Sequence, residues 1–180
     1  MKEQLSVIKD SFGRVVWTHK THEKQAEIYK TYCLIFNWLT IILTALTTGS
    51  LINVLLNDDQ GVKTSAILSA LSLGSLIAEL IFDFSGKRNS HKSVAKELWG
   101  VKEKYINLIA DIKSNGLDEP EIIRRRDSLT EHLTNIYNNA PPTSNDAYKK
   151  ASKALNVDNE HSFEENEVDQ FLPVDLRDLD

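Results

Sequence analysis

Cysteine is nearly absent from this chain of 180 residues, which contains only Cys33. A single cysteine excludes an internal disulfide and any metal cluster that needs several thiolates. The sequence also lacks a glycine-rich phosphate loop, a Ser/His/Asp arrangement and the paired carboxylates of nucleotidyltransferases. We therefore expect a protein that is not an enzyme and that needs no cofactor.

Dense clusters of lysine and arginine are also missing, so direct binding of nucleic acid is not expected. The first 16 residues, MKEQLSVIKDSFGRVV, have no continuous apolar segment and no small-residue cleavage site, so no signal peptide is predicted. The net charge of −5 is uneven, because residues 157–180 hold nine acids and one base and the remainder is mildly basic. We expect this acidic tail to be mostly disordered.

Charged side chains are absent from residues 32–56, YCLIFNWLTIILTALTTGSLINVLL. At about 1.5 Å per helical residue, this run spans roughly the hydrocarbon core of a bilayer. A second apolar run, residues 64–84, has only Glu79 and Asp83 as charged residues, near one end. The sequence predicts two membrane-spanning helices, at about 32–56 and 62–84, joined by a turn over residues 57–61.

The basic residues beside these spans predict their orientation. Three lysines precede the first span and four bases follow the second, whereas the intervening loop offers only Lys63. These flanking bases are Lys20, Lys24, Lys30, Lys87, Arg88, Lys92 and Lys96. Because cytoplasmic flanks are enriched in lysine and arginine, we expect a multi-pass protein of the cell (inner) membrane with both termini in the cytoplasm.

The remaining sequence predicts cytoplasmic helices at about 5–30, 92–114, 118–139 and 145–155. Asn115-Gly116 and Pro141-Pro142 mark helix ends, and Ser144 or Asn145 is a candidate cap for the last helix. The first of these helices is expected to continue into the first span without a break. Residues 1–156 therefore predict one all-α domain, a transmembrane helical hairpin with a cytoplasmic helical bundle, which we expect to be homo-oligomeric.

Both spans carry a polar sector, which lipid cannot solvate. Because a two-helix hairpin has little interior, these sectors predict contacts between copies or a water-filled path. The candidate pore-lining residues are Asn37, Thr40, Thr44, Thr47, Thr48, Ser65, Ser69, Ser72, Ser75, Glu79 and Asp83. Beside them, small residues that favour close helix packing recur every four positions: Ala66, Ala70, Gly74 and Ala78.

Glu79 admits three interpretations. In the first, a ring of Glu79 side chains, backed by Asp83 at the cytoplasmic mouth, forms a vestibule that favours cations. In the second, Glu79 lies in a plain contact between copies. In the third, it is an interfacial acid that pairs with Lys87 or Arg88.

Two polar clusters outside the spans are weaker candidates. His19 and His22 share a helix face with Glu23 nearby, but no third metal ligand is evident, so we expect structural histidines and no metal site. His91 and His132 are isolated in the sequence. The triplet Arg124–Arg126 is either a phosphate contact or a solvated helix face.

The order of these features resembles the SLATT domain, a two-transmembrane effector domain associated with SMODS and SLOG proteins. The resemblance covers about residues 6–156. It rests first on an N-terminal helix with an aromatic residue followed by His and a basic residue, and on the two spans that come next. A helix with His-x-x-x-Ala and a second aromatic residue follows, and a last short helix comes after a Pro-rich break. The matching residues are Trp17, His19, Lys20, His91, Ala95, Trp99, Tyr148 and Ala151.

This resemblance implies an effector of a prokaryotic anti-phage conflict system, which forms a membrane pore when a partner senses infection. Such a partner is a cytoplasmic sensor or a protein that generates a nucleotide signal, and the outcome is depolarisation with cell death or growth arrest. The alternative is a non-conducting membrane adaptor that recruits a cytoplasmic partner. Its docking peptide would be residues 171–174 of the acidic tail, which are otherwise a disordered remnant.

Overall fold

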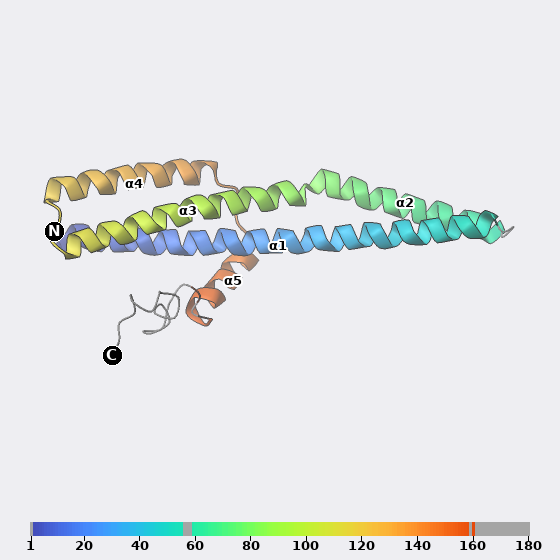
Figure 1. Ribbon diagram of the computed structural model, residues 1–180, viewed down its shortest axis with the longest axis horizontal. Helices are drawn as coiled ribbons and strands as arrows, with labels where there is room; N and C mark the ends of the chain where they lie inside the picture. The colour runs from blue at the N-terminus through green and yellow to red at the C-terminus, as the bar shows by residue number, and fades with distance from the viewer. Residues whose placement is uncertain (1, 56–58, 159, 161–180) are drawn as a thin grey trace, which may run out of the picture.

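The computed structural model describes residues 2–55, 59–158 and 160, and the chain forms an elongated rod of helices (Figure 1). The helices are α1 (Lys2–Leu55), α2 (Asp59–Phe82), α3 (Phe84–Lys113), α4 (Glu119–Asn139) and α5 (Asn145–Asn156). The described ranges contain no strand. The predicted all-α fold is therefore confirmed.

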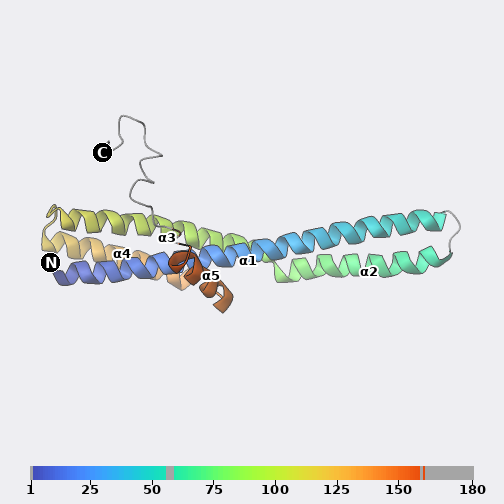
Figure 2. The ribbon, with the colours of Figure 1, turned by 90° about the horizontal axis from the view of Figure 1, so that it is seen from below.

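Helix α1 runs along the whole rod, with α2 and α3 packed end to end against it (Figures 1 and 2). Its 54 residues correspond to about 80 Å of helix, so the N-terminal segment and the first apolar run form one continuous element. This single helix therefore connects the two ends of the described rod directly.

The predicted turn over residues 57–61 is wrong in its second half, because α2 already begins at Asp59. Gly61 is helical and buried, and it allows a close approach rather than a chain break. A Cβ atom on Gly61 would lie 3.0 Å from Val54 Cγ2 and 3.3 Å from the Ser50 carbonyl oxygen. The first part of the predicted turn, residues 57 and 58, lies outside the described residues.

A single residue, Asp83, separates α2 from α3, so α3 begins at Phe84 rather than at the predicted residue 92. Asp83 adopts the left-handed conformation (φ 44°, ψ 54°), and its carboxylate accepts a hydrogen bond of 3.0 Å from the Gly86 amide. Because this bond caps the N-terminus of α3, the polar residues 85–91 form helix instead of a linker.

The extramembrane half of the rod has a hydrophobic core built by α1, α3 and α4. Ile8 of α1, Leu98 and Tyr105 of α3 and Ile122 of α4 are completely buried in it. Ile122 follows the Asp118 cap, whose carboxylate accepts a hydrogen bond from the Glu121 amide. Core apolar residues recur at helical spacing in α3 and α4, which explains why both fold onto α1.

Helix α5 crosses α1 on the side away from α4, which lies beyond α3 (Figure 1). Ser144 caps it by accepting a hydrogen bond from the Ala147 amide, and Ala147, Ala151 and Ala154 are buried on its inner face. The Trp17 ring stacks on the Tyr148 ring with centroids 5.6 Å apart. Trp17 therefore packs between helices.

The other half of the rod exposes apolar side chains. Among these, Trp38, Ile41, Ile67 and Leu80 are all more than half exposed. One apolar segment in α1 and one in α2 are long and apolar enough to cross a membrane, and little of either is buried within the chain. This surface is what lipid contact requires, so the two helices fit a transmembrane hairpin.

Aromatic rings gather where the apolar half meets the bundle. The Phe84 ring lies 5.3 Å from that of Tyr32, 5.2 Å from that of Phe36 and 5.5 Å from that of Phe82. Aromatic side chains are enriched at membrane–water boundaries. This cluster therefore marks the predicted end of the membrane segment and packs the α2–α3 junction against α1.

Candidate functional site

The polar sectors of the two spans face each other along the hairpin. Thr40 and Ser75 share a hydrogen bond of 3.1 Å, and Thr44 and Ser72 share one of 3.2 Å. Nearer the hairpin end, Ser65 donates to Ser50 Oγ at 2.8 Å. Hydroxyl groups that lipid cannot solvate thus satisfy one another within a single copy.

Other hydroxyls of the candidate set bond their own helix. Thr47 donates to the Leu43 carbonyl, Thr48 to the Thr44 carbonyl and Ser69 to the Ser65 carbonyl, four residues back in each case. Such bonds are common for Ser and Thr in membrane helices and need no partner helix. The polar sectors were expected to need contacts between copies or water. Most of these hydroxyls instead find their hydrogen-bond partners within one hairpin.

Part of the polar set remains exposed in the single chain. Asn37, Thr44, Thr48 and Ser69 are exposed, whereas Ser65 and Ser75 are buried. At about 100° per residue, the four exposed side chains fall on the same flank of the hairpin, beside the α1–α2 contact. The hairpin therefore has one polar flank, defined by these four residues, within an apolar surface.

Glu79 is partly exposed and shares the helix face of Ser72 and Ser75. The register of the hydroxyl pairs sets it at the level of Phe36 and Asn37. That level is about five residues, or roughly 8 Å, inside the first apolar run.

Asp83 is exposed and serves as the cap of α3. A role for either carboxylate in lining a pore stays a prediction.

The small residues lie on the side of α2 that faces away from α1. Ala66, Ala70 and Gly74 are exposed, Ala78 is partly exposed, and a Cβ atom on Gly74 would meet nothing within 4 Å. This face is not used inside the hairpin. Its predicted role in helix packing would therefore need a second copy or another membrane protein.

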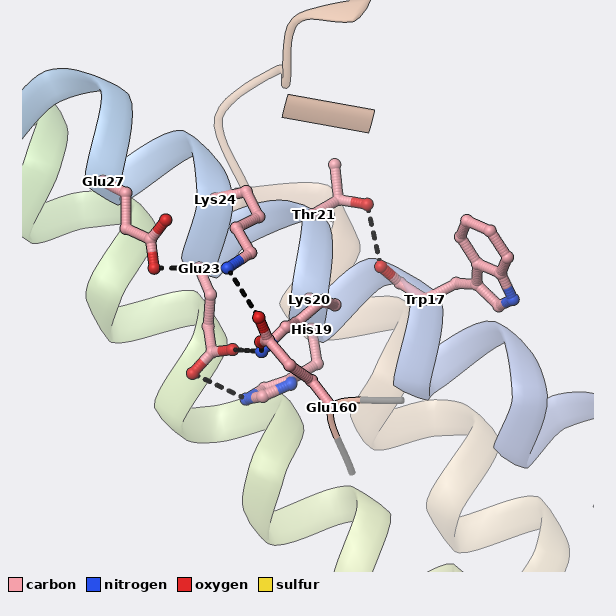
Figure 3. A network of polar contacts seen from close by, with 8 residues as sticks. All are labelled: Trp17, His19, Lys20, Thr21, Glu23, Lys24, Glu27 and Glu160. Atoms are coloured by element: carbon pink, nitrogen blue, oxygen red, sulfur yellow. Dashed lines mark hydrogen bonds and ion pairs between the residues drawn. The ribbon is translucent and has the colours of Figure 1, made fainter. Parts of the chain in front are cut away.

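A network of charges holds α1 to the chain beyond α5 (Figure 3). Lys20 is buried and pairs with Glu23 at 2.8 Å and with Glu160, while Lys24 reaches Glu160 at 3.3 Å and Glu27 at 3.5 Å. Burial opposes the charge on Lys20, but its bonds to Glu160 and Glu23 outweigh that effect and raise its pKa. Sequence reasoning placed Glu160 in a disordered tail; residues 159 and 161–180 lie outside the described residues.

Two histidines that are 69 residues apart meet between α1 and α3. The Nδ1 atoms of His22 and His91 are 2.9 Å apart, and both rings are buried. Burial, followed by the charges of His91 and His19, lowers the pKa of His22 to about 4. The sequence left the role of His91 unassigned, although His91 belongs to the His-x-x-x-Ala pattern on which the family resemblance rests.

Two further candidates from the sequence are a metal site and a phosphate contact at Arg124–Arg126. The described residues contain no group of three or more His, Cys, Asp or Glu side chains that could hold a metal ion. Arg124 and Arg125 both bind Glu121 at 2.7 Å, and Arg125 also reaches Asp111 of α3 at 2.8 Å. The arginine triplet therefore helps to join α4 to the rest of the bundle.

The chain matches one family of known protein domains. No curated protein and no solved structure matches the chain. Residues 5–167 match the SMODS and SLOG-associating 2TM effector domain family 4, which covers both spans and all five helices. The predicted resemblance is confirmed, and the chain belongs to this family of two-transmembrane effector domains.

Proposed function

We propose that this chain is a pore-forming effector of the cell (inner) membrane, which assembles into a homo-oligomer when a partner activates it. The partner is a cytoplasmic sensor or a protein that generates a nucleotide signal. Ion flow through the pore depolarises the membrane and causes cell death or growth arrest. Membership of a family of two-transmembrane effector domains supports the part of this proposal that makes the chain a membrane effector.

The polar flank carries the proposal. Asn37, Thr44, Thr48 and Ser69 are exposed on a surface otherwise covered by Ile and Leu side chains. Although Thr44, Thr48 and Ser69 each make a hydrogen bond within the chain, their exposed oxygens and the Asn37 amide still place polar atoms on this surface. In lipid, such a surface is more stable when it meets water or protein. Several hairpins arranged with these flanks inward would enclose a polar path, with Asn37 and Glu79 at one level near its cytoplasmic end.

A non-conducting membrane adaptor is the second candidate function. It is favoured by the three hydroxyl pairs across the hairpin, because they satisfy much of the polar surface without water. An adaptor would use its bundle or its acidic tail to recruit a cytoplasmic partner, with no change in membrane potential.

Planar-bilayer recordings of the purified full chain separate the two functions. The pore predicts discrete conductance steps with preference for cations. Glu79→Gln should shift the reversal potential in a KCl gradient toward zero, because one carboxylate per subunit is removed. A matched control is Glu97→Gln, which removes an exposed carboxylate of α3 from outside the spans.

The recordings test both the role of Glu79 and the choice between a pore and an adaptor. An unchanged reversal potential for Glu79→Gln would remove this residue from the pore. A complete lack of conductance, together with an intact potential in expressing cells that carry a potential-sensitive dye, would favour the adaptor.

A further inference from the structure

A groove with a volume of about 460 Å³ lies between α1 and α3, just beyond the aromatic cluster. Lys30 lines it from α1, and Arg88, Lys92 and Lys96 line it from α3. The same groove contains two carboxylates of α1, Glu23 and Glu27. Its ligand chemistry therefore depends on which of these charges are already compensated.

Both carboxylates have bases of α1 beside them. Glu23 accepts a hydrogen bond of 2.8 Å from Lys20, and Glu27 lies 3.5 Å from Lys24. Neither lysine lines the groove, and both also pair with Glu160, so the two carboxylates are only partly compensated. The four cations of the groove still outnumber its two carboxylates. Within the described residues, the four groove cations form no ion pair, so the groove keeps an excess of positive charge.

The four cations are arranged for an anion that has several oxygen atoms. Arg88, Lys92 and Lys96 are four residues apart, so they follow one face of α3 over about 12 Å. Lys30 approaches from the opposite helix. The partly exposed guanidinium of Arg88 offers paired donors, and the lysines add mobile point charges, a combination that suits phosphate.

The position of the groove decides which phosphates reach it. Lys30 lies two residues before the first apolar run, and Arg88 lies four residues after Phe84, so one end of the groove is at the predicted membrane surface. The other end, toward Trp99, extends into the aqueous bundle. Basic pockets between helices at the membrane surface bind anionic lipid headgroups.

We propose that this groove binds a phosphate-bearing anion, supplied by an anionic phospholipid headgroup or by a soluble phosphate compound. The site is separate from the polar flank and does not depend on ion conduction. Because the ligand touches both α1 and α3, its binding favours the conformation in which these helices are packed together.

The test compares full-length wild type with Arg88→Gln/Lys92→Gln. In the lipid arm, the protein is purified from mixed vesicles of phosphatidylglycerol and phosphatidylcholine, and its bound lipids are quantified by mass spectrometry. In the soluble arm, inorganic pyrophosphate is titrated at constant ionic strength against the melting temperature in zwitterionic detergent. The double variant should weaken binding by roughly 30-fold in whichever arm is positive, since each surface cation contributes about fivefold.

Two further variants guard against a merely structural effect. Lys149→Gln/Lys150→Gln removes two exposed lysines of α5 that do not line the groove, and it should bind like the wild type. Arg88→Lys/Lys92→Arg keeps the charge and should retain most of the affinity.

Enrichment of phosphatidylglycerol alone identifies a lipid headgroup, and stabilisation by pyrophosphate alone identifies a soluble phosphate. The proposal is overturned if neither probe distinguishes the groove variant from the wild type and the α5 control.

Discussion

At the scale of single residues, the contact between His22 and His91 makes the fold sensitive to pH. A hydrogen bond between two Nδ1 atoms needs one of them unprotonated, so the pair cannot hold a proton on both Nδ1 atoms. Tyr29 stacks on His91 from α1, and His19 adds a further ring nearby. No carboxylate accounts for the lowered pKa of either ring.

We predict that the folded state loses stability as the pH falls from about 6.5 toward 4. Burial lowers the pKa of both rings, so the unfolded chain takes up protons in this range that the folded chain does not. The loss attributable to His22 should reach at most about 3.5 kcal/mol, at about 1.4 kcal/mol per pKa unit. Melting temperatures of the detergent-solubilised protein across this pH range measure it.

The double variant His22→Gln/His91→Gln should flatten that profile, because amides can form an equivalent hydrogen bond and do not titrate. His132→Gln is the matched control, since His132 is exposed and should leave the profile unchanged. Identical pH profiles for the wild type and the double variant would show that other groups cause the acid sensitivity.

At the scale of elements, the junction between α2 and α3 depends on Asp83. Its left-handed backbone is unusual for a residue other than glycine, and its carboxylate supplies the cap of α3. The same region contains Gly86, where an added Cβ atom would lie 2.1 Å from Asp83 Oδ2. Cap and glycine therefore act together to start α3 immediately after the membrane segment.

We predict that Asp83→Ala destabilises this junction by about 1–2 kcal/mol, because both the capping bond and a residue tolerant of the left-handed region are lost. Asp83→Asn keeps both features and should behave like the wild type. Gly86→Ala should mimic Asp83→Ala by displacing the carboxylate. Hydrogen exchange of the amides of residues 84–88 in nanodiscs measures the effect.

The Asp83→Asn variant also separates capping from pore lining. If its junction is stable but its conductance is altered, the charge of Asp83 acts on ions. Faster exchange in Asp83→Asn than in Asp83→Ala would contradict the assigned cap.

At the scale of the whole molecule, the hairpin leaves the small-residue face of α2 unpartnered. Because α1 packs on the opposite side of α2, bulk added at Gly74 does not disturb the hairpin itself. Close approach of a second copy would place helix backbone against this face. The face thus offers a way to alter assembly without altering the fold of one chain.

We predict that Gly74→Leu reduces homo-oligomer formation at least several-fold while the melting temperature of the hairpin changes little. Crosslinking and mass photometry in nanodiscs measure the subunit number. Leu80→Phe is the control, because it adds volume at an exposed position of α2 beside this face. Equal oligomer populations for the wild type and Gly74→Leu would exclude the small-residue face from the interface.

The sequence by itself determined the all-α class of the fold and the presence of two segments that fit a transmembrane hairpin. These properties depend on local chemistry: two long apolar runs, apolar residues at helical spacing, and a cap such as Ser144. The start of α3 was missed, because a single left-handed aspartate has no strong local signal. Gly61 was misread, because its sequence context does not reveal that α1 packs against it.

Only the tertiary structure decided which polar groups meet. The Thr40–Ser75 bond, the His22–His91 contact and the ion pair of Lys20 with Glu160 each join residues far apart in the chain. Their formation depends on the register of α1 against its partners, which no local pattern specifies. The same register turned most hydroxyls inward and left one polar flank outside, because two packed helices can bury only the faces that they share.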